Sequence, residues 1–222
     1  MLLHGVGLRA EAWEAQEALA DACRVVAVDL PGHGGSDPLP DGARLPDYVA
    51  WGGRVLEAVG PASVAGHSMG ARIAAGLAVE RPDLVRRPAV VGALFRRPPR
   101  ARAAVLARAE EIAAGGAAPL APLGRWFAEG DHEARARVAG WLCRADPQGY
   151  ATAYRAFAEG DATYADRWGS IACPVLVATG ADDPNSTHAM ARAMAAAAPD
   201  ARLAILKGHR HMVGLTAPEA VT

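Results

Sequence analysis

Six short apolar runs recur along the chain, and this repetition constrains its fold more than any other feature. The runs are continuous and do not alternate with polar residues, which is typical of strands buried on both faces of a parallel sheet. They occupy residues 1–4, 24–30, 62–67, 88–94, 174–180 and 201–207. Helical patterns lie between them, at about 10–20, 46–59, 70–81 and 186–198. This alternation predicts an α/β fold with a doubly wound, mostly parallel sheet.

The segment between the fourth and fifth runs breaks this rhythm. It is rich in Ala, Arg and Glu, with Pro-Pro, Gly-Gly and Asp-Pro interruptions. We therefore expect a helical cap over one edge of the sheet at residues 96–170, and a core formed by residues 1–95 and 171–222. The chain begins inside its first strand, so the sheet is expected to lack leading strands and to expose an edge, which would favour a homo-oligomer.

Residues 62–76, ASVAGHSMGARIAAG, place Gly-x-Ser-x-Gly between an apolar run and a helical pattern. Glycines on both sides of a serine suit neither a strand nor a helix. In a nucleophile elbow they allow a strained turn that exposes the serine hydroxyl, and side chains at Gly66 and Gly70 would collide with the neighbouring strand and helix. The alternative is a Gly-Ser turn without chemistry. The position favours Ser68 as a nucleophile.

A nucleophilic serine requires a base, and the base requires an orienting carboxylate. The sequence VLVATGADDPNS supplies Asp182 and Asp183 directly after one apolar run, and LKGHRHMVGL supplies His209 and His211 after the next. Carboxyl ends of parallel strands share one edge of a sheet, so these loops should lie beside the elbow. The order Ser, Asp, His fits serine catalysis on an α/β sheet.

An oxyanion hole is the remaining requirement of such chemistry. The sequence LLHGVGLRAEAW contains a His-Gly-x-Gly loop directly after the first apolar run. We expect the backbone N–H groups of Val6 and Met69 to stabilise the oxyanion.

Four motifs together resemble the α/β-hydrolase superfamily, particularly its small bacterial serine esterases and 3-oxoadipate enol-lactonase-like members. They are LLHGVGLRAEAW, VVAVDLPGHGGS, GHSMG and the tail TGADDPNS…GHRHMVGLTAPEAV, and they span nearly the whole chain. The resemblance implies Ser68 as nucleophile and Asp183 as acid, with Asp182 as the alternative. It implies His211 as the base and makes His209 a loop residue.

The resemblance also implies a function, hydrolysis of a carboxylic ester or lactone in a small organic substrate through an acyl-enzyme. The same triad serves carbon–carbon bond hydrolases, perhydrolases and acyltransferases, and some proteins of this fold bind without catalysis. Substrate selection is expected from the cap, with His67, Trp126 and Tyr154 in the pocket. Alternatively, the aromatic residues are the core of the cap. Arginines near the start of the cap could attract a carboxylate or simply be solvated; these are Arg96, Arg97, Arg100 and Arg102.

Other classes of function are not indicated. The formal net charge of −1 gives no argument for nucleic acid, and no apolar run approaches the roughly 18 to 20 residues of a membrane span. No cofactor motif occurs, and the histidines and three cysteines have no metal-ligand spacing. The absence of a signal peptide favours a cytoplasmic location. One lysine against 22 arginines suggests a GC-rich bacterial genome.

Overall fold

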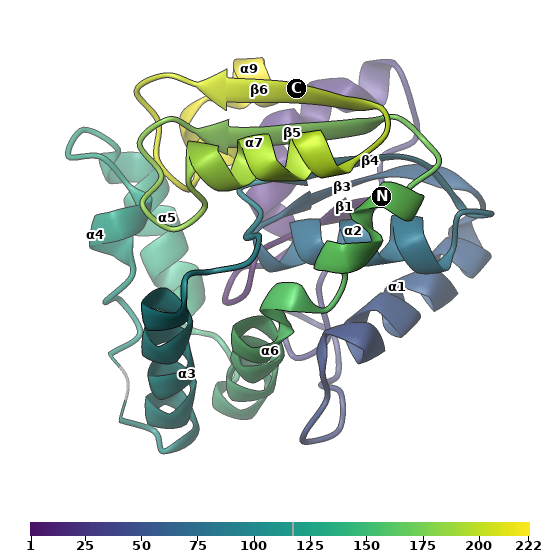
Figure 1. The fold of residues 1–222 in the computed structure, drawn as a ribbon. Helices are drawn as coiled ribbons and strands as arrows, with labels where there is room; N and C mark the ends of the chain where they lie inside the picture. Colours follow the sequence, from purple (N-terminus) through teal and green to yellow (C-terminus); the bar gives the residue numbers. More distant parts are fainter. Residues whose placement is uncertain (117) are drawn as a thin grey trace.

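The computed structural model describes residues 1–116 and 118–222, and its centre is a parallel sheet of six strands (Figure 1). The strand order is β2-β1-β3-β4-β5-β6, and every neighbouring pair is parallel. The strands are β1 (Leu2–Leu3), β2 (Ala27–Val28), β3 (Ala62–His67), β4 (Val85–Val91), β5 (Val175–Gly180) and β6 (Ala201–Leu206). Each apolar run of the sequence thus supplies one strand.

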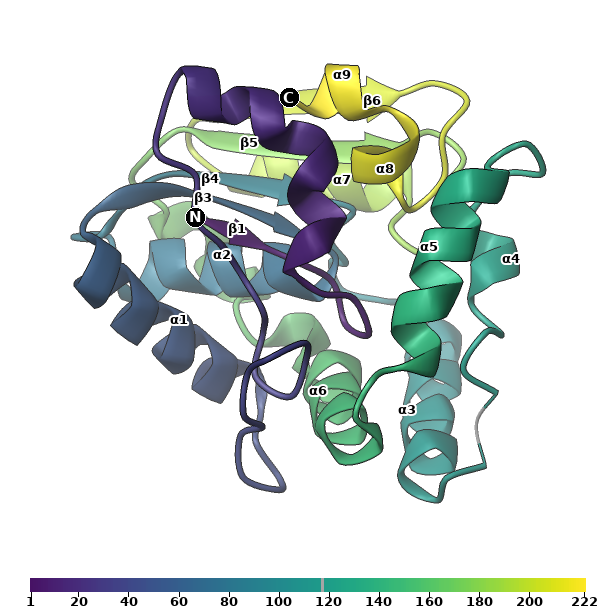
Figure 2. The ribbon, with the colours of Figure 1, turned by 180° about the vertical axis from the view of Figure 1, so that it is seen from behind.

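Helical elements cover both faces of this sheet, which confirms the doubly wound α/β prediction. One face carries α1 (Leu45–Val59), α2 (Met69–Glu80) and α7 (His188–Ala197) (Figure 1). The other face carries η1 (Ala10–Asp21), α8 (Val213–Thr216) and α9 (Pro218–Val221) (Figure 2).

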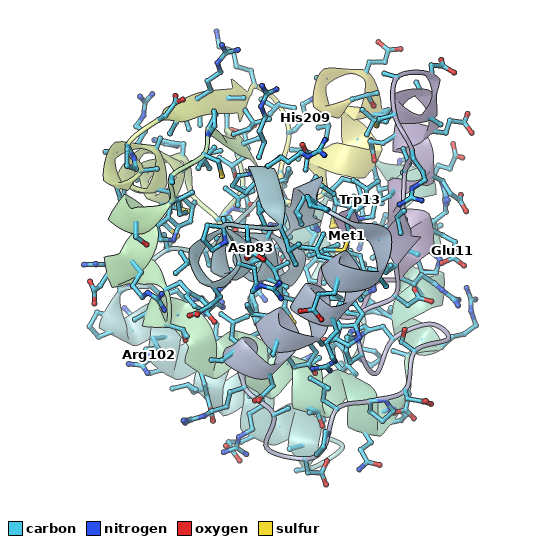
Figure 3. The ribbon with its side chains drawn as sticks, turned by 90° about the vertical axis from the view of Figure 1, so that its right-hand side faces the viewer. Met1, Glu11, Trp13, Asp83, Arg102 and His209 are labelled. Carbon is cyan, nitrogen blue, oxygen red and sulfur yellow. The ribbon has the colours of Figure 1, made fainter. Side chains whose placement is uncertain are left out.

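The η1 segment is the one predicted helix that differs in type. It is a 3₁₀ segment with a kink at Gln16, whereas the sequence pattern predicts an ordinary helix. Its buried face includes Trp13, which points toward the sheet, while Glu11 lies at the outer surface (Figure 3). The helical pattern at about 10–20 locates the segment, but it specifies neither the 3₁₀ conformation nor the kink.

The fourth strand is shifted relative to the prediction, because it covers 85–91 and not 88–94. Pro88, the first residue of the predicted run, lies inside the strand. The strand ends where Gly92 turns the backbone with φ 58°. Ala93 and Leu94 remain buried, so the apolar run reflects burial beyond the strand as well as within it.

Between β4 and β5 the described residues form four helices, at the end of the sheet to which the strands point (Figures 1 and 2). They are α3 (Pro99–Ala113), α4 (Leu123–Trp126), α5 (His132–Cys143) and α6 (Pro147–Glu159), followed by the short segments η2 (Gly160–Ala162) and η3 (Ala165–Ser170). Phe127 and Trp141 belong to a small apolar core with Leu8 and Met212. These two aromatic side chains therefore hold the inserted helices to the sheet domain.

The strand order fixes where a site can form. The chain runs outward from β1 to β2 and then returns to place β3 on the other side of β1. The loops that follow β1 and β3 consequently diverge at the carboxyl ends of these strands, which is where open α/β sheets bind ligands.

Across the described residues, no helix is both long and apolar enough to cross a membrane.

Candidate active site

Ser68 occupies a strained turn between β3 and α2. Its φ of 54° and ψ of −110° lie in a region that side-chain-bearing residues rarely adopt. A Cβ on Gly66 would lie 2.1 Å from the Gly70 carbonyl oxygen, and one on Gly70 would lie 2.2 Å from that of Leu3. Both glycines are therefore required by close backbone contacts with the helix and the strand, as the motif predicts. Helix α2 begins directly after Ser68, so its N-terminus favours negative charge there.

Asp183 and His211 form a buried acid–base pair. His211 Nδ1 lies 2.7 Å from Asp183 Oδ2, and both residues are 4 % exposed. Asp183 Oδ1 accepts hydrogen bonds from the backbone N–H groups of Asn185 at 2.8 Å and Ser186 at 3.1 Å. Burial alone would raise the pKa of the Asp183 carboxyl, but His211 and these donors hold it below its ordinary value. The carboxylate is thus ionised and oriented toward the imidazole.

The two alternative residues lie elsewhere. Asp182 is exposed, and its backbone N–H donates to the His209 carbonyl at 3.0 Å. The His209 ring bonds through Nδ1 to the hydroxyl of Thr216 at 3.0 Å. The structure therefore brings Asp183 together with His211 and does not bring Asp182 or His209 to that pair.

We expect Asp183→Asn to lower kcat by about 10⁴, the loss that the corresponding change causes in a serine protease. An asparagine keeps the shape but can present an N–H to Nδ1, which selects the wrong imidazole tautomer. Asp182→Asn is the matched control and should leave kcat within about twofold. Steady-state ester hydrolysis by both variants checks this, and an equal loss in both would contradict the assignment.

Ser68 and His211 open on one cavity of about 450 Å³. Val6, Trp126 and Tyr154 also line it, and the Trp126 and His211 ring centroids are 5.8 Å apart. Among the hydrogen bonds of the described residues, none joins the Ser68 hydroxyl to His211. Such bonds are often long in unliganded enzymes and tighten when substrate binds.

His67 does not line this cavity, although the sequence placed it in the pocket. Its Nε2 donates to the His211 backbone carbonyl at 3.0 Å, and the two rings are 4.8 Å apart. Burial, and secondarily His211, lower its pKa to about 3, so the ring is neutral. His67 therefore supports the loop that carries His211.

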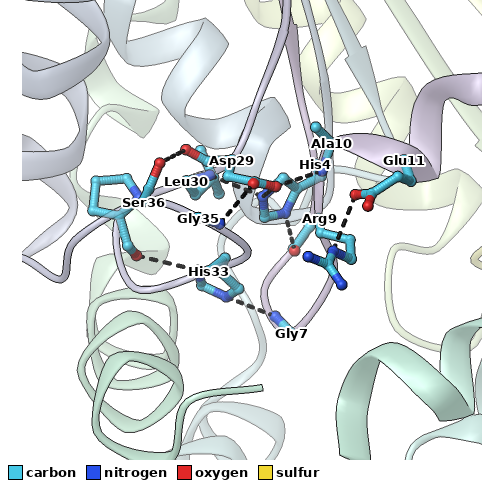
Figure 4. Close-up of polar contacts among 12 residues, drawn as sticks. His4, Gly7, Arg9, Ala10, Glu11, Asp29, Leu30, His33, Gly35 and Ser36 are labelled. Carbon is cyan, nitrogen blue, oxygen red and sulfur yellow. Dashed lines mark hydrogen bonds and ion pairs between the residues drawn. The ribbon is translucent and has the colours of Figure 1, made fainter. Parts of the chain in front are cut away.

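The loop after β1 is fixed by two buried histidines (Figure 4). The Gly7 N–H donates to His33 Nε2 at 2.9 Å, and the Leu30 N–H donates to His4 Nε2 at 2.9 Å. Each ring uses its other nitrogen toward a backbone carbonyl, at Pro31 and Gly5 respectively. An imidazole that accepts at one nitrogen and donates at the other must be neutral. Burial lowers the pKa of both rings accordingly.

Asp29 also holds this loop in place through hydrogen bonds. Its carboxylate accepts from the Ala10 N–H at 2.7 Å and the Gly35 N–H at 2.9 Å (Figure 4). The N–H groups of Val6 and Met69 have no acceptor among the described residues. Val6 lines the cavity and Met69 follows the serine. Backbone N–H groups without a protein acceptor, on either side of a serine, are what an oxyanion hole requires.

The neutral histidines predict a loss of stability in acid. His4, His33 and His67 have lowered pKa values in the fold, whereas the unfolded chain binds protons near pH 6.5. The contribution of these histidines to the free energy of unfolding is therefore fully present above pH 6.5. It falls as the pH decreases, by up to about 1.4 kcal/mol per pH unit for each histidine. Denaturant unfolding between pH 7.5 and 4.5 measures this.

A pair of variants isolates the contribution of one ring. His33→Gln keeps an acceptor for Gly7 but cannot be protonated, so its stability should depend less steeply on pH. His132→Gln alters an exposed histidine and should retain the full slope. Identical slopes in wild type and His33→Gln would contradict the neutral assignment.

Sequence reasoning missed several residues at the site. Asn185 and Ser186 orient Asp183, and the Asp-Pro-Asn-Ser run is a recognisable turn sequence that could have indicated this. Arg97, Arg108 and Arg125 line the cavity, whereas Arg96, Arg100 and Arg102 do not. Of the arginines that the sequence indicates as able to attract a carboxylate, only Arg97 lines the cavity.

Across the described residues, no group of three or more His, Cys, Asp or Glu side chains is arranged to bind a metal.

Comparisons with known proteins agree with this architecture. A family model described as "Alpha/beta hydrolase family" matches residues 1–222. The chain is 46% identical over 226 residues to an (E)-2-((N-methylformamido)methylene)succinate hydrolase of Acinetobacter baylyi, covering 100% of this chain and 86% of that protein. 

Solved structures are also similar. An enol-lactonase from Burkholderia xenovorans LB400 has a TM-score of 0.88 at 26% identity, covering 99% of this chain and 86% of that one. A thermophilic esterase from Thermogutta terrifontis has a TM-score of 0.87 at 26% identity, covering 99% and 85%. The likeness therefore extends over the sheet, the loops and the inserted helices.

Proposed function

The chain belongs to the alpha/beta hydrolase family and is a hydrolase. From that premise, we propose that it uses a Ser68-His211-Asp183 triad to cleave the ester or lactone bond of a small organic substrate. One observation carries this proposal. Ser68 sits in a strained turn and opens on the same cavity as His211, whose far nitrogen is bonded to the buried Asp183.

The proposed cycle assigns a role to each group. His211 Nε2 takes the Ser68 proton while the oxygen attacks the carbonyl, and Asp183 stabilises the imidazolium that forms. The Val6 and Met69 N–H groups hold the oxyanion, aided by the positive end of α2. The imidazolium then gives its proton to the leaving group, and water hydrolyses the acyl-enzyme. The fixed loop after β1 supports this because it keeps the Val6 N–H in place.

The division of the chain is part of the same proposal. Residues 1–95 and 171–222 would supply the nucleophile, base and acid, and residues 96–170 would form the cap that selects the substrate. The presence of Trp126 and Tyr154 in the cavity supports a selecting role for the inserted helices.

A second candidate function is hydrolysis of an N-acyl bond. The relative of 46% identity is named for a substrate with an N-methylformamido group, and the coverage of this chain is complete. The same triad attacks amide and ester carbonyls, so the two candidates differ in the leaving group and not in the assigned residues.

A fluorophosphonate probe tests the proposed function, because it reacts only with an activated serine. We expect one label per chain, mapped to Ser68 by peptide mass spectrometry. Turnover of p-nitrophenyl esters, lactones and N-formyl enamides then separates the candidates. A folded, unlabelled protein would refute the hydrolytic role of Ser68.

A further inference from the structure

The cavity that contains Ser68 and His211 is lined by three arginines, Arg97, Arg108 and Arg125, which we call the cavity arginines. Arg97 precedes α3, Arg108 lies within α3 and Arg125 lies in α4. No Asp or Glu is among the described residues that line this cavity. A concave site lined by charge of one sign concentrates the opposite charge.

Arg97 belongs to a buried cluster in which cations outnumber anions. Its guanidinium pairs with Asp161, and Arg72 Nη1 lies 3.7 Å from the same carboxylate. The three side chains are almost fully enclosed, with Arg97 9 % exposed. Burial, and then Arg97, lower the pKa of Arg72 to about 9, so Arg72 is still charged at neutral pH. Two guanidiniums share one carboxylate, so the cluster is net positive, but Arg72 does not line the cavity that contains Ser68.

Arg125 supplies an unmatched charge in the cavity itself. No acidic side chain of the described residues lies within ion-pair distance of it. Arg108 differs, because its Nη1 is 3.3 Å from Glu111, an exposed carboxylate that contributes little. Its Nη2 donates to the Ala118 carbonyl at 2.6 Å. Arg125 thus has no acidic partner and Arg108 has only an exposed one, so the cavity faces about two cations that no buried carboxylate neutralises.

The positive charges converge on one side chain of the cavity. Burial raises the pKa of Tyr154, while Arg97, Arg108 and Arg125 each act to lower it and Glu111, with the smallest effect, raises it slightly. All three cations thus lie close enough to interact with one hydroxyl that lines the cavity. That hydroxyl can donate a hydrogen bond to an anion held there.

We propose that the cavity arginines bind carboxylates of the substrate and that the preferred substrate is a small acyl compound bearing two carboxylates. The inference deepens the proposed function and rests on it. A guanidinium binds a carboxylate through two parallel hydrogen bonds, which fixes direction as well as charge. Two unmatched cations are best neutralised by a dianion, and the scissile carbonyl is then held toward Ser68.

Binding of free dicarboxylate tests the inference without turnover. Succinate and butyrate have the same four-carbon chain and differ by one carboxylate. We expect isothermal titration calorimetry to give succinate at least tenfold higher affinity than butyrate at low salt. Raising the salt concentration should reduce the difference, since charge attraction produces it.

Variants assign the effect to the cavity. Arg125→Gln should remove most of the preference for succinate, and Arg108→Gln should reduce it. Arg97→Gln would leave Asp161 without its main partner and could unfold the protein, so it is not required. Arg102→Gln is the matched control, because Arg102 is an exposed residue of α3 that points outward (Figure 3) and does not line the cavity.

Two results would overturn the inference. One is equal affinity for succinate and butyrate, and the other is an unchanged preference in Arg125→Gln. Neither depends on Ser68, whereas failure of the proposed function would appear as absent fluorophosphonate labelling. The two failures are therefore distinguishable in the same preparation.

Discussion

Ser68→Ala should abolish ester hydrolysis, lowering kcat by on the order of 10⁶ as loss of the nucleophile does in subtilisin. The alanine removes the attacking oxygen, and no other hydroxyl of the described residues occupies the elbow. Steady-state kinetics measures the loss, and the fluorophosphonate label should disappear with it. The residual rate would report what the oxyanion donors and binding contribute alone.

The turn at residue 68 requires a folding control. Because Ser68 holds φ at 54°, its replacement changes a strained position, and the unfolding transition should be measured alongside activity. Ser170→Ala is the matched control, since Ser170 is exposed and its hydroxyl bonds only to the Arg167 carbonyl. Wild-type labelling of Ser68→Ala would place the reactive group elsewhere.

His211→Ala should reduce kcat by a similar factor, on the order of 10⁶. The base and nucleophile act as one unit, so removing either loses nearly the same transition-state stabilisation. The substitution also leaves the Asp183 carboxylate buried without its imidazole partner. Some loss of stability is therefore expected, and kcat must be compared on folded protein.

His209→Ala distinguishes the base from its neighbour. His209 contacts Thr216 and lies two residues from His211 in the same loop. We expect its loss to change kcat by less than about tenfold, through loop position only. Comparable losses in both variants would show that the loop is structural and that His211 has no special role.

The fold could be predicted because its signals are local. Continuous apolar runs report burial on both faces, and β3 and β5 were located to within one residue. The kink at Gln16 and the shift of β4 could not be predicted, because tertiary packing sets where a strand ends within a buried run.

The candidate site was predictable to a different degree. Gly66 is explained within the motif, because a Cβ there would collide with the carbonyl of Gly70, four residues later, whereas Gly70 is required by its contact with Leu3, which is distant in the chain. The choice between Asp182 and Asp183 depended on family resemblance and not on the residues, because both follow the same strand. Only the folded loops separate them, placing one beside His211 and the other in solvent.

By itself, the sequence determined a doubly wound parallel sheet and a strained serine between a strand and a helix. Periodicity and glycine spacing are properties of neighbouring residues, so they can be read without a fold. The tertiary structure alone decided which histidines are neutral and which arginines face the cavity. Those properties depend on burial and on partners distant in the chain. The Gly7 N–H, for example, donates to the His33 ring, and Asp161 forms an ion pair with Arg97. Charge and proton position are set by surroundings that exist only after the chain has folded.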